Sequence, residues 1–397
     1  MAQPKIAVGI DIGTYQVKVV IASRNEDVRQ PPRILGTGYA ESRGMRRGYT
    51  ISVPETARAV RAAVMQAAGG ARIKIGSAYL SVGHEGLDET TSRGEAVVER
   101  GDAIITPRDM ERALEASQAA LAPARLQNNR IIHRIPLRWS VDGTKVLGKD
   151  PSGMKGIRLA VETLFITVPE KHVADLVEAV EGAGIEVEDV IASPLAASFV
   201  TLTKTQKRVG CMLANIGAET LGMAVFEDDA PISMKIFPTG AADIAGDLAL
   251  GLKIPLEEAE QLKMGAVLGS PYPKKKVDDI VGKRITAMFK PIEAHLKKIN
   301  KDELLPAGVV LTGGGASIPG LSDIVQSIIR LPTRIGAPIT DVGKTQLQGG
   351  SWTVAYGLTL WGLTSRDDIE PRDAGSFRDT FGDLFSSVVK FFKKFLP

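Results

Sequence analysis

The sequence predicts an α/β protein made of two related halves, and three observations lead to this prediction. Residues 6–21 and residues 209–226 share one pattern: an apolar strand rich in β-branched residues, a tight turn that opens on Asp11 or Asn215 with a glycine two residues later, and a returning strand. Residues 308–321 add a third glycine-rich turn at the end of an apolar strand. The repeated hairpin indicates an internal duplication.

Residues 1–77 and 169–192 are expected to form the first half. After the hairpin, residues 33–40 read as a third strand, and residues 54–68 as an alanine-rich helix with proline in its first turn and a glycine pair at its end. Residues 170–192 add an amphipathic helix and a strand that returns to the sheet. Three strands followed by a helix are the opening of a ribonuclease-H-like half.

Residues 78–168 interrupt the first half and are expected to form a small inserted α+β domain. We expect a strand at residues 78–82, a helix at residues 106–121 that begins with a threonine and an aspartate in capping positions, and strands near residues 130–141 and 159–168.

Residues 193–231 and 301–350 are expected to form the second half, with a mainly helical subdomain at residues 232–300 and a closing helix at residues 351–363. The helices expected in the subdomain occupy residues 243–252, 255–267 and 277–298.

Composition excludes several function classes. The formal net charge of +3 is too small to indicate nucleic-acid binding, and the chain has no aromatic and basic stripe. The four histidines lack metal-ligand spacing, and the single cysteine cannot form an internal disulfide, which is typical of a reducing cytoplasm. The N-terminus lacks the sections of a signal peptide, and no apolar run reaches the roughly 18 residues that span a bilayer.

The glycines of the two hairpins, Gly13 and Gly217, allow backbone to approach a ligand closely, so that turn amides can donate hydrogen bonds to phosphate. Each motif alone is also typical of ordinary hairpins. In the order hairpin, hairpin, glycine strand, however, they resemble the two phosphate loops and the adenosine loop of the actin-like ATPases, which implies an actin-like fold with ATP between two domains.

Beyond these loops, the chain resembles the FtsA family of bacterial cell-division proteins over roughly residues 5–363 and the apolar tail. The segments that carry the resemblance are residues 141–143, 150–159, 193–197, 243–247 and 257–263.

The resemblance implies that ATP and Mg²⁺ bind in the cleft, with Asp11 organising the metal through water. The first phosphate loop would supply Asp11, Gly13, Thr14 and Lys18, and the second Asn215, Gly217, Glu219 and Thr220. Base and ribose would contact Glu260, Lys263, Gly313, Gly314, Gly315, Ser317 and Ile318. From the residues alone, Lys18 is equally typical of an exposed strand, and Glu260 with Lys263 of an ordinary helix-surface pair.

Two positions depart from the pattern of hydrolytic relatives. Asn215 replaces the usual aspartate of the second loop and removes one negative charge from the metal site. Ser193 stands where such relatives carry an acidic or amide side chain that orients the attacking water. We therefore expect nucleotide binding with very slow or undetectable hydrolysis.

The resemblance also implies partners. The helical subdomain would receive the C-terminal peptide of the tubulin-like protein FtsZ, with Lys283, Arg284 and Lys290 as candidate contacts, although a merely solvated charged face gives the same pattern. The inserted domain would carry self-interaction and contacts with later division proteins, and the chain would assemble into actin-like filaments on the cytoplasmic face of the cytoplasmic membrane at the division site.

The tail is the feature that indicates membrane contact. Residues 364–375 are polar and read as a flexible linker, and residues 376–397 form an amphipathic pattern with phenylalanine on one side and lysine crowded at the end. Six half-buried phenylalanines at about 1 to 1.5 kcal/mol each contribute roughly 6 to 9 kcal/mol in total, before the cost of ordering the helix. One tail therefore binds weakly, and several tails on one polymer bind firmly. A helix docked on its own globule is the alternative. The residues expected to contact anionic lipid are Phe377, Phe381, Leu384, Phe385, Val388, Lys390, Phe391, Phe392, Lys393, Lys394 and Phe395.

Two other functions share this fold. A PilM-like platform of a type IV pilus machine has a related inserted domain, and sugar or acetate kinases have similar phosphate loops. The kinases require a catalytic base and a substrate pocket between the halves, and the sequence indicates neither.

Overall fold

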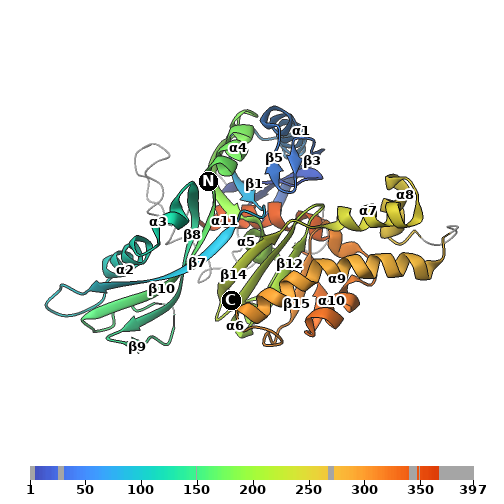
Figure 1. Cartoon of the computed structure of the whole chain (residues 1–397). Helices are drawn as coiled ribbons and strands as arrows, with labels where there is room; N and C mark the ends of the chain where they lie inside the picture. Colours follow the sequence, from blue (N-terminus) through green and yellow to red (C-terminus); the bar gives the residue numbers. More distant parts are fainter. Residues whose placement is uncertain are drawn as a thin grey trace.

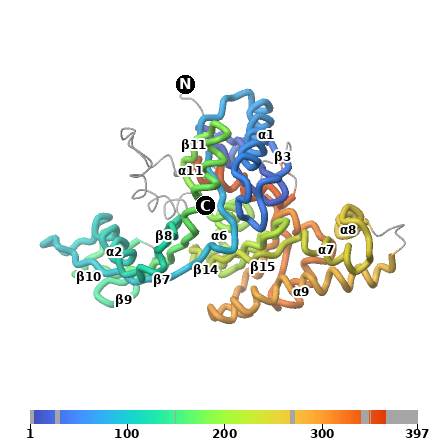
Figure 2. The backbone as a smooth tube through the Cα atoms, turned by 45° about the horizontal axis from the view of Figure 1, so that its top comes forward, coloured from blue at the N-terminus to red at the C-terminus, as the bar shows by residue number. Residues whose placement is uncertain are grey.

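The computed structural model describes residues 5–25, 31–148, 150–266, 272–338, 347 and 349–365. Two sheet-based halves form the body of the molecule. The inserted domain extends from one side of this body and the helical subdomain from the opposite side, so the two lie far apart (Figures 1 and 2). The predicted linker at residues 364–375, apart from its first two residues, and the predicted tail helix lie outside the described residues.

The first half is built on a five-stranded sheet with the order β11-β6-β1-β2-β3. Strands β1 to β3 form an antiparallel meander, while β1 and β6, and β6 and β11, are parallel. Both faces of the central strands are buried, as their continuous apolar runs predict. The strands are β1 (Ile6–Ile12), β2 (Gln16–Ser23), β3 (Arg33–Glu41), β6 (Ser77–Val82) and β11 (Glu186–Ala192).

The second half repeats this arrangement in a sheet with the order β14-β13-β12-β15-β16. Again three strands form an antiparallel meander and the following pairs are parallel. This repetition is the internal duplication that the two hairpins predict. The strands are β12 (Cys211–Ile216), β13 (Leu221–Glu227), β14 (Ala230–Phe237), β15 (Val309–Thr312) and β16 (Thr333–Ile335).

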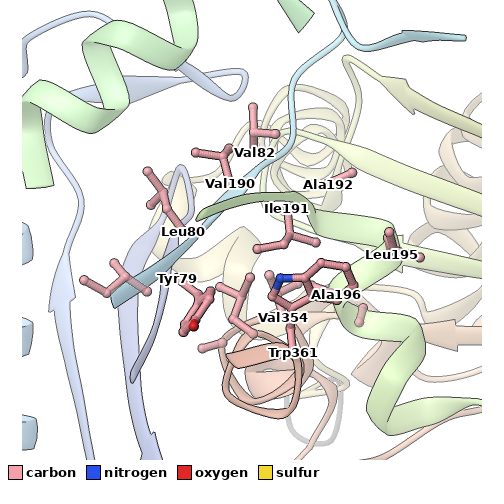
Figure 3. Packing of buried hydrophobic residues seen from close by; sticks show 14 of the residues in the cluster. Tyr79, Leu80, Val82, Val190, Ile191, Ala192, Leu195, Ala196, Val354 and Trp361 are labelled. Carbon is pink, nitrogen blue, oxygen red and sulfur yellow. The ribbon is translucent and has the colours of Figure 1, made fainter. Parts of the chain in front are cut away.

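Helices cover the first sheet and join it to the second half. On one face, α1 (Val53–Ala71) packs on β3 and contacts α4 (Glu170–Glu181). On the other face, α11 (Thr353–Ser365) packs against β1 and against α5 (Ser193–Thr201). Figure 3 shows this layer, with Trp361 of α11 beside Ala196 of α5.

Glycine lets α11 approach its neighbours closely. A Cβ atom at Gly9 of β1 would lie 2.1 Å from the carbonyl oxygen of Ala355, and one at Gly357 would lie 1.9 Å from that of Ala196. Because backbone atoms form both contacts, any larger residue would force the helix away. The predicted closing helix at residues 351–363 corresponds to α11 and the short 3₁₀ helix η2 (Gly350–Trp352) that precedes it.

The helical subdomain packs on one face of the second sheet, and the two share a hydrophobic core of their own. Helix α7 packs on α8 and on the long helix α9, and α9 also contacts α10. The helices of the second half are α6 (Lys204–Val209), α7 (Ala241–Leu252), α8 (Leu256–Lys263), α9 (Lys274–Lys298), the 3₁₀ helix η1 (Gly314–Ser317) and α10 (Leu321–Ile329).

The inserted domain is a four-stranded sheet with the order β7-β10-β8-β9, covered by α2. Trp139 and Leu159 belong to its separate small core. The predicted cap forms, because the backbone N–H and the hydroxyl of Thr106 donate to Asp109 Oδ2 at 2.9 and 2.6 Å. Its elements are β7 (Asp88–Val97), α2 (Pro107–Ala119), α3 (Pro123–Leu126), β8 (Asn129–Val141), β9 (Thr144–Lys145) and β10 (Arg158–Pro169).

Two predicted boundaries differ from the structure for the same reason. Residues 78–82, expected in the inserted domain, belong to β6 and pair with both neighbours in the first sheet. Residues 232–237, expected in the helical subdomain, complete β14 of the second sheet. In both cases the strand lies at a junction, and its pairing partners decide its domain.

The inserted domain is fastened to the second half at one buried joint. Glu89 of β7 accepts hydrogen bonds from the Ser233 hydroxyl at 2.9 Å and from the Met234 N–H of β14 at 2.5 Å. His295 Nε2 of α9 lies 2.7 Å from the same hydroxyl. The insert also contacts the first half, where His133 of β8 accepts the Ala192 N–H of β11 at 3.0 Å, so the buried Glu89 carboxylate adds a direct link to the second half.

Candidate functional site

A cavity of about 430 Å³ lies between the two halves. The β1–β2 turn and the β12–β13 turn occupy equivalent positions in the two sheets, so the duplication places both at this cavity. The glycine-rich segment after β15 forms a third wall. The volume lies in the range of small-molecule sites.

The two turns have the same internal geometry. The Gly13 N–H donates to the Gln16 carbonyl oxygen at 3.1 Å, and the Gly217 N–H donates to that of Thr220 at 2.8 Å. A Cβ atom at either glycine would approach the same oxygen to 2.9 or 3.0 Å. These two amides therefore close their own turns, and the neighbouring backbone borders the cavity.

A half-buried carboxylate and a half-buried lysine face each other at the first turn. Asp11 and Lys18 occupy opposite positions of the β1–β2 pair, and Asp11 Oδ1 accepts a hydrogen bond from the Ser81 hydroxyl at 2.8 Å. Burial raises the pKa of Asp11, whereas Lys18 and the Ser81 hydrogen bond act to lower it. Burial likewise lowers the pKa of Lys18, and Asp11 opposes this shift.

Glu260 and Lys263, both on helix α8, also line the cavity. Their side chains form an ion pair, and the Lys263 ammonium also donates to the Ala241 carbonyl oxygen at 3.3 Å. The Lys263 side chain is only 7% exposed, whereas that of Glu260 is 45% exposed. Lys263 is thus held by α7 and α8, and Glu260 keeps contact with solvent.

Side-chain-free backbone forms the third wall. Gly313 has φ 88°, and a Cβ atom there would lie 2.4 Å from the Ile216 carbonyl oxygen and 2.5 Å from Asn215 Oδ1. At Gly314 a Cβ atom would meet nothing closer than 3.9 Å, so this residue presents open backbone to the cavity. The site requires glycine at the first position because of its conformation and close contacts.

Most of the residues that the sequence singles out come together at this cavity. Ser193, expected near the attacking water, also lines it, and a Cβ atom at Gly83 would lie 2.2 Å from its hydroxyl oxygen. The predicted residues that line the cavity are Asp11, Gly13, Thr14, Lys18, Asn215, Gly217, Thr220, Glu260, Lys263, Gly313, Gly314, Gly315 and Ile318.

Two predicted residues are not among those that line the cavity. Ser317 is exposed on η1. Glu219 turns toward the first half, where its carboxylate accepts the Arg47 backbone N–H at 2.6 Å. An acidic side chain is poorly suited to a phosphate loop, and this contact gives it a partner in the first half, next to the cavity-lining Gly48.

The structure adds lining residues that sequence reasoning missed. Ser81, a polar residue between Leu80 and Val82 in strand β6, carried a recognisable signal, whereas Gly48 and Ser351 come from segments without a motif. The additional lining residues are Ile12, Tyr15, Gln16, Gly48, Ser81, Gly83, Ala218, Ala241, Ala242, Met264, Ser351 and Val354.

The donor set suits a nucleotide whose metal is held mainly by phosphate and water. Lys18 of the first half and Lys263 of the second half both line the cavity, together with glycine backbone. Among the residues described by the structure, no three histidine, cysteine or acidic side chains are grouped to bind a metal directly. Asp11, the half-buried carboxylate at the first turn, is the residue that would orient metal-bound water.

The candidate partner residues lie on α9, away from the cavity. Lys283 and Lys290 are exposed and seven positions apart on the helix. Arg284 instead pairs with Asp247 of α7 through two hydrogen bonds of 2.6 Å. This pair fastens α9 to α7, so Arg284 already has a structural role.

The predicted lipid-contacting residues, from Phe377 to Phe395, lie outside the described residues. Within the described ranges, no helix combines the length and apolarity needed to cross a bilayer.

Comparison with known proteins identifies the family. The chain is 30% identical over 360 residues to the cell division protein FtsA of Enterococcus faecalis, which covers 85% of this chain and 80% of that protein. The chain belongs to the FtsA family. The FtsA family profile, described as cell division protein FtsA, matches residues 212–357, and that of the SHS2 domain inserted in FtsA matches residues 88–167. FtsA of Pseudomonas aeruginosa is 26% identical over 386 residues, which cover 92% of this chain and 91% of that protein.

Solved structures agree on the fold. The type IV pilus biogenesis complex PilM-PilN superposes with a TM-score of 0.67 at 18% identity, over 92% of this chain and 99% of that chain. MreB 5 of Spiroplasma citri bound to AMPPNP superposes with a TM-score of 0.51 at 10% identity, over 92% and 98%. The predicted actin-like fold with an inserted domain is confirmed, and FtsA membership, rather than likeness to PilM, assigns the chain to the cell-division proteins.

Proposed function

We propose that this FtsA-family chain binds ATP with Mg²⁺ and anchors the division ring to the cytoplasmic face of the cytoplasmic membrane. It polymerises there into actin-like filaments, tethers FtsZ through the FtsZ C-terminal peptide and recruits later division proteins. The observation that carries the proposal is the cavity between two duplicated glycine turns, in a fold shared with an MreB structure that holds AMPPNP.

The residues around the cavity divide the work of holding the nucleotide. Lys18 supplies positive charge at the phosphate end, and the Asp11 carboxylate, held by Ser81, orients the metal's water shell. At the other end, Glu260 offers a carboxylate to ribose hydroxyls while Lys263 fixes its position. Bound Mg²⁺ and ATP would supply charge that both halves contact, which favours the closed arrangement of the halves.

Slow hydrolysis follows from Ser193 at the phosphate end. A serine hydroxyl is a weak base at neutral pH, and it is shorter than the acidic or amide side chain that would orient water. Asn215 offers a neutral amide where a carboxylate would strengthen the metal site. We therefore assign the nucleotide a structural role in assembly.

FtsZ tethering is assigned to the exposed lysines of α9. Lys283 and Lys290, seven positions apart on α9, form an exposed basic face on this helix. Such a face suits an acidic peptide, because complementary charge steers association.

Vesicle co-sedimentation tests the proposed function directly. The full chain is mixed with anionic vesicles, Mg²⁺ and a fluorescent ATP analogue, beside a chain that ends at Gly375. We expect the full chain to pellet with the vesicles and to carry the analogue, while the shortened chain binds the analogue and stays in solution. A full chain that stays in solution when saturated with nucleotide would remove the membrane-anchor assignment.

A further inference from the structure

One hydrogen bond joins the two halves at the edge of the cavity. Glu219 lies within the second glycine turn, and its Oε2 atom accepts the backbone N–H of Arg47 at 2.6 Å. Arg47 belongs to the first half, in the hairpin of β4 (Met45–Arg46) and β5 (Tyr49–Thr50), which we call the strap. The bond therefore bridges residues 172 positions apart in the chain.

The tip of the strap is a tight turn pressed against the first half. Arg47 and Gly48 have φ values of 47° and 80°, as in the two-residue turns that suit β-hairpins. Gly48 lines the cavity, and a Cβ atom there would lie 2.5 Å from the Gly83 carbonyl oxygen. The strap backbone thus packs against Gly83 and donates a hydrogen bond to the Glu219 carboxylate.

Buried side chains attach the strap to the first half. Met45 is buried in the core of that half. The Tyr49 ring packs on His84 and His172, with ring centroids 4.8 and 5.4 Å apart. Because these contacts all belong to the first half, the strap moves with it.

Glu219, in contrast, is fixed to the second half. The Ala242 N–H donates to the Ala218 carbonyl oxygen at 2.8 Å, which ties the second turn to the start of α7. A Cβ atom at Gly240 would lie 2.7 Å from the Glu219 backbone nitrogen, so the turn packs closely against this segment. Separation of the halves must therefore break the bond between Glu219 and Arg47.

We propose that Glu219 is a positioning residue that holds the strap across the cavity and thereby slows nucleotide release. It acts through the Arg47 amide and contacts no phosphate. The inference rests on the proposed function, because it assumes that the cavity holds a nucleotide. Its chemical requirement is an acceptor oxygen at this position, which a glutamine amide also provides.

Two measurements on the full chain test the proposal, with Glu219→Ala, Glu219→Gln and Glu115→Ala as variants. Glu115 is an exposed carboxylate of the inserted domain and controls for the loss of one charge. The first measurement is the rate at which a pre-bound fluorescent ATP analogue leaves the chain in Mg²⁺. We expect release to accelerate roughly tenfold in Glu219→Ala, the lower end of what a hydrogen bond to a charged acceptor contributes. Glu219→Gln should stay within about twofold of wild type, and Glu115→Ala should be unchanged.

The second measurement needs no nucleotide. Hydrogen exchange of the peptide that contains Arg47 should accelerate in Glu219→Ala, and Glu219→Gln should restore much of the protection. Wild-type release from Glu219→Ala, or equal exchange in all variants, would overturn the inference alone. Failure of the wild-type chain to retain the analogue would overturn the proposed function, and the inference with it.

Discussion

Replacing Gly313 by alanine tests whether the glycine wall shapes the cavity. The new Cβ atom would lie 2.4 Å from the Ile216 carbonyl oxygen, about 1 Å closer than ordinary packing allows. Because that oxygen belongs to the backbone, β12 or the glycine segment must move. Gly313 has φ 88° and ψ 173°, a conformation that costs an alanine about 1 to 3 kcal/mol, and the forced shift costs roughly 1 to 3 kcal/mol more.

The matched control is Gly320→Ala. Gly320 also has a positive φ, 72°, but a Cβ atom there meets nothing within 4 Å. It shares the positive φ, although its ψ of 0° places it in the left-handed helical region rather than in the extended region of Gly313, and it lacks the displaced strand. Titration with a fluorescent ATP analogue should show at least roughly tenfold weaker binding in Gly313→Ala and near wild-type binding in Gly320→Ala. Equal affinities in the two variants would refute the reasoning.

Three further predictions follow from other contacts. Asn215→Asp should lower the Mg²⁺ concentration that half-saturates ATP binding severalfold, because it adds a negative charge; an unchanged titration contradicts this. Replacing Lys283 and Lys290 by glutamate should weaken binding of the FtsZ C-terminal peptide roughly tenfold, measured by anisotropy, while glutamate at Lys145 and Lys155 of the insert should not. The third concerns half-buried Asp189, which accepts the Trp361 indole N–H at 2.9 Å; desolvation raises its pKa from 3.8 to about 7. Between these two pKa values the folded chain keeps a proton that the unfolded chain loses. The contribution of the protonated carboxyl to the free energy of unfolding is therefore fully present below about pH 4 and is lost as the pH rises to 7. Urea unfolding should show the wild type losing roughly 1.4 kcal/mol per pH unit relative to Asp189→Asn between pH 5 and 7, and parallel curves would exclude the effect.

Local signals made much of the site predictable. The strand, turn and glycine of each hairpin are adjacent in the chain, and the short turn fixes Lys18 opposite Asp11. Because the sheets are duplicated, locating one turn also located the other. The glycine wall likewise follows from consecutive residues after an apolar strand.

The rest depends on contacts between distant segments. Gly48 reaches the cavity only because the strap packs against the Gly83 loop, and no local pattern encodes that. Glu219 has the right position for a phosphate loop, but its partner across the cleft lies in the other half. Strand β7 contains few apolar residues, so the sequence pattern does not predict it. Its pairing with β10, rather than intrinsic strand propensity, makes it a strand.

The Glu89 joint has a consequence for solubility. Strand β14 is an edge strand of the second sheet, and an edge strand presents unpaired backbone groups with which another chain can pair. Here the insert covers that edge, and Glu89 accepts a hydrogen bond from the Met234 N–H. The same carboxylate that connects two parts of the molecule thus also blocks unwanted strand addition between copies crowded together.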